Sequence, residues 1–80
     1  MPKAQHSPAY KLLPFLLKNM RETAGMTQRD LGKKLRKPQS WIYNCESGNR
    51  RVDVTEFAFW CRACGADSIK AFGEVLGKLR

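Results

Sequence analysis

Apolar residues recur along the chain at intervals of three and four positions, which is the spacing of amphipathic helices. Glycines and capping residues divide this pattern into five short stretches, so the sequence predicts an all-α fold. The first helix is expected over residues 14–24, and Gly25 ends it in a left-handed conformation. Because a proline inside a helix removes a hydrogen bond, Pro14 is placed at the helix start and residues 8–13 are expected to form an irregular turn.

The second expected helix begins at Thr27, whose hydroxyl can accept a hydrogen bond from the first turn as an N-cap. Leu31 and Leu35 lie one turn apart and are expected to face inward. Gly32 falls where this helix would cross the next one, and its missing side chain permits close backbone approach. Residues 27–46 therefore predict two short helices joined by a tight turn.

The third expected helix, residues 38–46, has a polar face with nothing of its own to pack against. Pro38 suits the first helical position, because the N–H that proline lacks would be unbonded there. At 3.6 residues per turn, Trp41, Ile42 and Cys45 share most of the inner side. The outward face carries the polar residues Gln39, Ser40, Tyr43, Asn44 and Ser47. A helix with such a face requires an external partner.

Two further helices complete the pattern. Asp53 and Glu56 have the spacing of a capping box, which predicts a fourth helix that runs to about Cys64 and ends at Gly65. A fifth helix is expected to follow from Asp67. The apolar face of the fourth helix is expected to comprise Phe57, Trp60, Cys61 and Cys64. That of the fifth is expected to comprise Ile69, Phe72, Val75, Leu76 and Leu79.

The chain carries 15 lysines and arginines against 7 acidic residues, a formal net charge of +8. Residues 28–51 hold seven of the basic residues and two acids, so +5 of this charge lies in under a third of the chain. Charge concentrated in this way is typical of a nucleic-acid-binding surface, whereas solubilising charge is more evenly mixed. With neither a membrane-spanning stretch nor a signal peptide evident, we expect a cytoplasmic, nucleoid-associated protein with no membrane partner.

Few residues in the sequence indicate a metal site, a redox site or an active site. Cys61 and Cys64 have CxxC spacing and Cys45 is a third thiol, but a structural zinc site needs four ligands and the one histidine is His6, near the N-terminus. A redox CxxC pair normally opens a helix, whereas this pair lies late in one, on its apolar face. We therefore interpret the thiols as buried and inert, and expect no metal, no cofactor and no enzyme activity.

One set of positions has the spacing of a known family: Gln28, Leu31, Gly32, Leu35, Gln39, Ser40, Ile42, Glu46 and Gly48. These residues resemble the helix-turn-helix of phage repressor and Cro-type regulators, also called the xenobiotic-response-element (XRE) family. The resemblance extends over about residues 13–79 and implies a compact five-helix, lambda-repressor-like domain. We expect a single domain at residues 8–80 after a flexible arm at residues 1–7. Two features depart from the pattern: the turn glycine is replaced by Arg36, and Tyr43 and Asn44 are individual to this chain.

The resemblance implies a sequence-specific transcriptional regulator, here a repressor, whose third helix enters the major groove of duplex DNA. Glutamine and asparagine amides can each make two hydrogen bonds to an adenine edge, and serine can pair with either base type. The expected base-reading residues are Gln39, Ser40, Tyr43 and Asn44. The expected DNA-backbone contacts are Gln28, Arg29, Lys33, Lys37, Trp41, Ser47, Asn49, Arg50 and Arg51. Exposed N–H groups beyond Gly48 are expected to meet a phosphate as well.

Family members commonly pair an arginine with a glutamate at the positions that match Arg21 and Glu46. A planar guanidinium can hold a carboxylate by two parallel hydrogen bonds, which would fix the first helix against the third. The pair would also neutralise an acid that otherwise faces DNA phosphates. We therefore expect Arg21 and Glu46 to form a structural ion pair.

The expected assembly is a homodimer on two half-sites about one helical turn apart. Phe59 falls outside the apolar stripe of the fourth helix, and an exposed phenylalanine beside the fifth helix indicates a partner surface. The expected dimer interface comprises Phe59, Phe72 and Leu76. Two alternatives remain open. The fold could serve as a protein-interaction module, such as an antitoxin component that holds a toxin, with DNA binding secondary. The partner could also be RNA, although two aromatic residues on one helix make a poor stacking platform.

Overall fold

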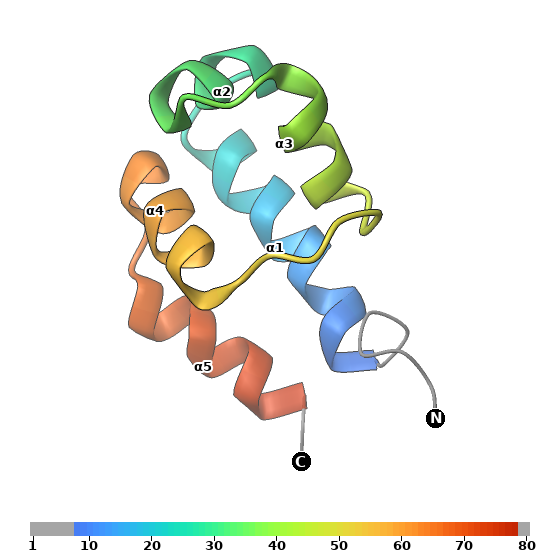
Figure 1. Ribbon diagram of the computed structural model, residues 1–80. Helices are drawn as coiled ribbons and strands as arrows, with labels where there is room; N and C mark the ends of the chain where they lie inside the picture. Colours follow the sequence, from blue (N-terminus) through green and yellow to red (C-terminus); the bar gives the residue numbers. More distant parts are fainter. Residues whose placement is uncertain (1–7, 79–80) are drawn as a thin grey trace.

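The computed structural model describes residues 8–78, which form five α-helices (Figure 1). The helices are α1 (Pro8–Thr23), α2 (Gln28–Leu35), α3 (Gln39–Glu46), α4 (Val54–Cys64) and α5 (Ser68–Lys78). This part of the chain contains no strand, so the predicted all-α fold of five helices is confirmed. The central helix α1 contacts α3, α4 and α5, while α2 packs on α3 and α4 at one end of the molecule.

The core lies where α1, α2, α3 and α4 meet. Its most deeply buried residues come from all four helices: Leu17, Leu31, Ile42, Cys45, Trp60 and Cys61. The indole N–H of Trp60 donates a hydrogen bond of 3.0 Å to the carbonyl of Leu17. A buried N–H needs such an acceptor, so the largest core side chain also ties α4 to α1. The predicted inner face of α4 is confirmed, with Cys64 partly rather than fully buried.

The first helix is longer than the sequence predicts. The expected turn at residues 8–13 is wrong, because α1 is helical from Pro8 onward with Pro14 in its interior. An interior proline removes one hydrogen bond and crowds the carbonyl four residues earlier. Packing outweighs this cost: Leu13 packs against the core and shares a small cavity with Phe72 and Val75 of α5. The helix therefore continues through Pro14 because its extra turns have a partner.

Local capping chemistry sets the helix starts. At α2, the side chain of Thr27 accepts a hydrogen bond of 3.0 Å from the N–H of Asp30, and the Asp30 carboxylate accepts one of 2.9 Å in return. Asp53 and Glu56 form the same reciprocal capping box at the start of α4. The glycines that follow α1 and α4 adopt left-handed φ angles of 75° and 67°. These predicted boundaries are confirmed.

The turn between α2 and α3 is tight. A Cβ on Gly32 would lie 2.6 Å from the carbonyl oxygen of Lys37, so the position requires glycine, as predicted. Arg36 is left-handed, with φ 57° and ψ 44°, at the position where the family usually has glycine. Pro38 is extended, with ψ 156°, and is the N-cap rather than the first helical residue. That prediction is wrong by one position: Pro38 has an extended backbone while its carbonyl already accepts the N–H of Trp41, as an N-cap residue does.

The last helix packs against its neighbours with only part of its apolar face. Ala71 is buried and Val75 is half-buried, since α5 meets α1 and α4 along one edge. Three other residues of its apolar face are exposed: Ile69 (85%), Phe72 and Leu76. Exposure of Phe72 and Leu76 in the monomer is what their expected place in a dimer interface requires. Leu79 lies outside the described residues. In residues 8–78, no helix combines the length and apolarity needed to cross a bilayer.

Candidate nucleic-acid interface

The outward face of α3 lies at the end of the molecule that α2 and α3 form (Figure 1). Gln39, Ser40 and Tyr43 are exposed there, and Asn44 is half-buried beside them. The side-chain oxygen of Asn44 accepts a hydrogen bond of 3.4 Å from the amide of Asn49. The structure thus brings the four expected base-reading residues together on one face of α3. Their contact with bases stays a prediction.

A buried ion pair supports this face from behind. Arg21 of α1 is 8% exposed, and its guanidinium donates to both carboxylate oxygens of Glu46, at 2.6 and 3.0 Å. A third bond of 2.8 Å reaches the carbonyl of Met26. Hydrogen bonding to Glu46 raises the pKa of Arg21 above its ordinary value, so the charge is permanent. The expected pair is present, and it holds the end of α3 against α1.

The ion pair continues toward the surface through two amides. Gln28 donates a hydrogen bond of 3.1 Å to Glu46 and accepts one from the amide nitrogen of Gln39. Gln28 therefore connects the buried carboxylate to the first residue of α3. Sequence reasoning assigned Gln28 to a phosphate and missed this link. The sequence carried no signal of this link, because it depends on Gln28 lying beside Glu46, 18 residues away, in the folded chain.

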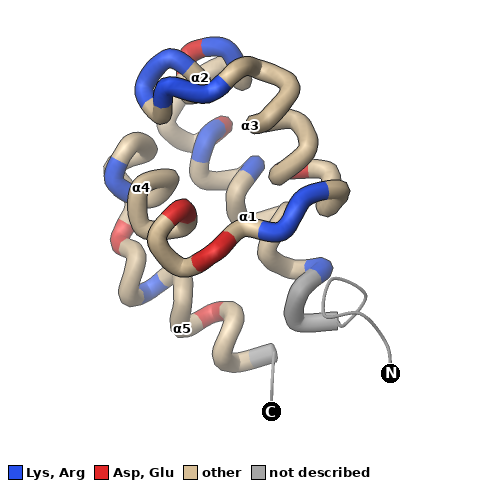
Figure 2. Tube along the Cα trace, in the orientation of Figure 1, with Lys and Arg blue, Asp and Glu red and all other residues tan. Residues whose placement is uncertain are grey.

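Basic residues are concentrated along α2 and the α2–α3 turn (Figure 2). Four of them line a hollow of about 390 Å³ together with Gln39: Arg29, Lys33, Arg36 and Lys37. Within residues 8–78, none of these four cations forms an ion pair with a carboxylate. Their charge is therefore available to an external anion. Arg36 belongs to this group, although it was counted only in the basic cluster and was not among the expected DNA contacts.

The loop from α3 to α4 differs from expectation. The N–H groups of Gly48, Asn49 and Arg50 donate to carbonyls at the end of α3, at 3.0–3.4 Å. The expected free N–H groups beyond Gly48 are therefore absent at these three positions, because they close the helix end instead. Arg50 makes a bidentate pair with Glu56, at 3.1 and 3.2 Å, and its pKa is raised by this bonding. Arg51 is exposed.

Trp41 lies between the two basic segments. Its ring packs against Trp60, with centroids 6.2 Å apart. The ammonium of Lys37 lies 5.1 Å from the Trp41 centroid, and the guanidinium carbon of Arg50 lies 4.9 Å from it. Both distances are typical of cation–π contacts. Trp41 therefore contacts one cation from the segment before α3, Lys37, and one from the segment after it, Arg50.

The cysteines contribute no reactive group to this surface. All three are free thiols, with Cys45 and Cys61 buried and Cys64 half-buried. Burial raises the pKa of Cys45 and of Cys64 to about 11, and it also raises that of Cys61. The thiols are thus protonated at neutral pH, and thiolate is the reactive form. Among the described residues, no group of acidic, histidine or cysteine side chains is arranged to hold a metal.

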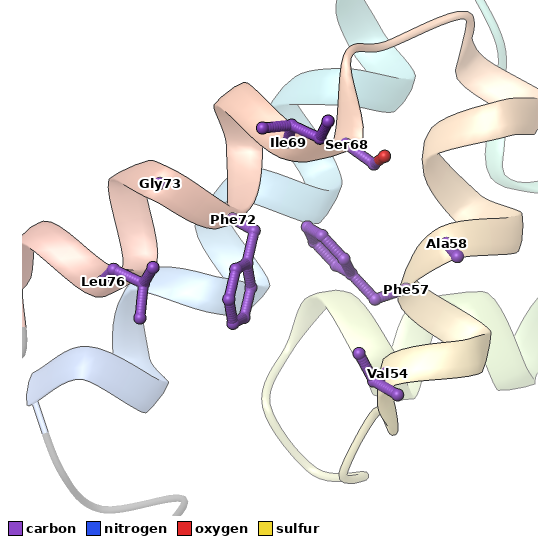
Figure 3. Close-up of a pocket in the computed structure, with 8 residues that line it drawn as sticks. All are labelled: Val54, Phe57, Ala58, Ser68, Ile69, Phe72, Gly73 and Leu76. Atoms are coloured by element: carbon purple, nitrogen blue, oxygen red, sulfur yellow. The ribbon is translucent and has the colours of Figure 1, made fainter.

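A second surface without a partner lies between α4 and α5. It is an apolar groove of about 400 Å³ (Figure 3), lined by Val54, Phe57, Ala58, Ser68, Ile69, Phe72, Gly73 and Leu76. The rings of Phe57 and Phe72 face each other across it. Phe59 is 52% exposed, as expected, but it does not line this groove.

Comparisons with known proteins agree with this geometry. The model of a helix-turn-helix domain family matches residues 13–70. An XRE-family like protein from Pseudomonas syringae pv. tomato str. DC3000 shares 36% identity and a TM-score of 0.83, over 90% of this chain and 88% of that one. The clp gene regulator ClgR from C. glutamicum shares 25% identity and a TM-score of 0.76, over 100% and 97% of the two chains. A comparison with curated protein sequences gave no match.

The restriction-modification controller protein C.Esp1396I shares the fold at lower identity. Its tetramer, solved in complex with a natural 35 base-pair operator, is 20% identical with a TM-score of 0.77, over 91% of this chain and 96% of that one. The family model covers well over half of the present chain. The chain therefore belongs to the helix-turn-helix domain family, among the DNA-binding transcriptional regulators of XRE type. The family resemblance stated from the sequence is confirmed.

Proposed function

We propose that this protein binds a specific operator in duplex DNA through α3 and represses transcription from it. One observation supports the proposal most: the exposed polar face of α3 is flanked by unpaired cations and is held from behind by the Arg21–Glu46 pair. A solvated surface helix needs neither feature. A helix that must meet a base edge at hydrogen-bond distance needs both, because orientation and charge each have to be set in advance.

In this proposal α3 lies in the major groove, where each base pair presents a distinct pattern of donors and acceptors. Gln39, Ser40, Tyr43 and Asn44 read base edges. Arg29, Lys33, Lys37 and the exposed loop residues Ser47, Asn49 and Arg51 contact phosphates on the two sides of α3. Trp41, which is half-buried, can contribute its indole N–H.

We further propose that the protein acts as a homodimer through the α4–α5 groove. Exposure of large apolar side chains such as Phe72 and Leu76 to water is unfavourable, and a second copy of the protein would cover them. Phe59 would lie at the margin of this interface. A two-fold dimer places two α3 helices on half-sites about one helical turn apart. The operator-bound tetramer of C.Esp1396I, which shares the fold, supports assembly on DNA.

In this proposal, repression follows when the protein occupies its operator. A dimer that covers two half-sites within a promoter excludes RNA polymerase from the same DNA and needs no further surface. The second candidate function is a protein-interaction module, such as an antitoxin component, in which the α4–α5 groove holds a toxin. This alternative would be favoured if the apolar groove were still open in the DNA-bound protein.

Selection of bound duplexes from a random pool tests the proposal. We expect an enriched motif with two-fold symmetry, and affinity that falls steeply with salt as phosphate contacts release counterions. No enrichment, together with binding that is insensitive to salt, would reject DNA recognition and favour the interaction module.

A further inference from the structure

Two cations share the ring of Trp41, but their surroundings differ. Lys37 approaches the ring from the α2–α3 turn and has no carboxylate partner among the described residues. Arg50 approaches it from the α3–α4 loop and makes a bidentate ion pair with Glu56. Figure 2 shows the basic stretch of this loop running directly into the acidic start of α4. One side of α3 therefore presents unpaired charge, and the other presents a neutralised arginine next to the exposed Arg51.

We infer that Glu56 limits how strongly the protein holds DNA, because it competes with a phosphate for the guanidinium of Arg50. The inference rests on the proposed DNA binding and adds a regulator of its strength. Glu56 would be a positioning residue that acts through Arg50 and touches no nucleotide. Sequence-independent affinity would thus be lower than the count of basic residues suggests, which favours recognition that depends on the base contacts of α3.

The geometry explains why the competition is effective. Both terminal nitrogens of Arg50 point at Glu56, and one of them also donates to the backbone carbonyl of Arg51. Trp41 covers the guanidinium from a third direction. A phosphate that reaches the remaining N–H groups meets the carboxylate within a few ångströms, so attraction and repulsion nearly cancel. Full attraction would require the Arg50–Glu56 pair to separate.

A conservative variant can remove the charge of Glu56 and keep its role in the fold. Glu56 also accepts the backbone N–H of Asp53 at 3.0 Å and completes the capping box of α4. Glutamine serves equally at this position of a capping box. Glu56→Gln therefore removes the competitor of the phosphate and leaves the start of α4 intact.

The test compares Glu56→Gln with Glu74→Gln, which removes the same charge from an exposed position on α5. Binding to a random-sequence duplex is measured by anisotropy over a range of salt concentrations. We expect Glu56→Gln to tighten binding about two- to five-fold more than Glu74→Gln does at low salt. The slope of log affinity against log salt should steepen by about 0.9, the value for one added phosphate contact.

A second pair of variants identifies Arg50 as the group released. Arg50→Gln should change the affinity little in the wild-type background and should abolish the gain in the Glu56→Gln background. Equal effects of Glu56→Gln and Glu74→Gln would overturn the inference, as would weaker binding by Glu56→Gln with an unchanged urea midpoint. Absence of duplex binding by the wild-type protein is a different result, and it would reject the proposed function itself.

Discussion

The molecule has two surfaces without a partner, and they are built in opposite ways. The α2–α3 end is polar, and two of its side chains, Gln28 and Gln39, are held by hydrogen bonds that lead back to the buried Arg21–Glu46 pair. The α4–α5 groove is apolar, and its lining side chains come from both helices, of which α5 buries few residues of its own. At the first surface, part of the geometry is therefore set before any partner binds. At the second surface, few contacts within the molecule fix the exposed side chains of α5, and a partner would supply the missing ones.

The difference follows from the interactions that each kind of surface can use. Hydrogen bonds have direction, so a polar face recognises a partner only if its groups are already oriented. Apolar contact has no direction and grows with buried area, so an apolar face can adjust as it is covered. We therefore expect changes behind α3 to alter specificity and stability together. Changes in the groove should alter assembly and leave the fold of the monomer intact.

The largest effect is expected from breaking the buried ion pair. Either Arg21→Met or Glu46→Gln should lower the free energy of unfolding by about 3–5 kcal/mol, because each strands the other charge in a poorly hydrated site. Urea unfolding of both single variants and the double variant forms a double-mutant cycle. Losses that add within about 0.5 kcal/mol would mean that the two charges are not coupled.

The next effect concerns the polar surface itself. Gln39→Ala should lower affinity for the selected operator by about 1–3 kcal/mol, and a change of the base pair that Gln39 contacts should remove this loss. Arg51→Ala is the matched control, since a phosphate contact carries no sequence information and its loss should weaken all duplexes alike. Competition assays with operator and random duplexes measure both variants. An equal loss on operator and random DNA for Gln39→Ala would show that α3 is not the base-reading helix.

The groove is tested by charge placed on its wall. Phe72→Glu should weaken self-association at least about tenfold, because burying a carboxylate opposes the apolar contact there. Phe59→Glu introduces the same charge on α4 outside the groove and should have a smaller effect. Sedimentation equilibrium measures both. If Phe59→Glu dissociates the dimer and Phe72→Glu does not, the interface lies on the outer face of α4 instead.

The smallest effect separates the backbone of the α2–α3 turn from its charge. Arg36→Gly should raise the free energy of unfolding by up to about 1 kcal/mol, since glycine adopts the left-handed conformation without steric cost. The same change removes one cation from the hollow and should make DNA binding slightly less salt-dependent. Lys33→Gln, at a position of ordinary helical backbone, is the control for the loss of charge. A less stable Arg36→Gly protein would mean that this position is unstrained.

By itself, the sequence determined the features that depend on residues close together in the chain. Capping boxes at Thr27 and Asp53 set helix starts, and Gly32 marked the close crossing of α2 and α3. Helical periodicity also separated the buried side of α3 from its polar face. These features are predictable because their physical causes act within one or two helical turns. The Arg21–Glu46 pair joins distant residues, and it was predicted only through the family resemblance.

The tertiary structure decided what depends on distant neighbours. Pro14 stays inside α1 because α5 provides a partner for the preceding turns, and the apolar stripe of α5 stays exposed because the helix meets its neighbours along one edge. The contacts of Arg50 with Glu56 and with the ring of Trp41 also came from the tertiary structure, and its contact with a phosphate stays a prediction. In each case the outcome depends on contacts between residues of different helices and loops. The local periodicity of the chain does not predict such contacts.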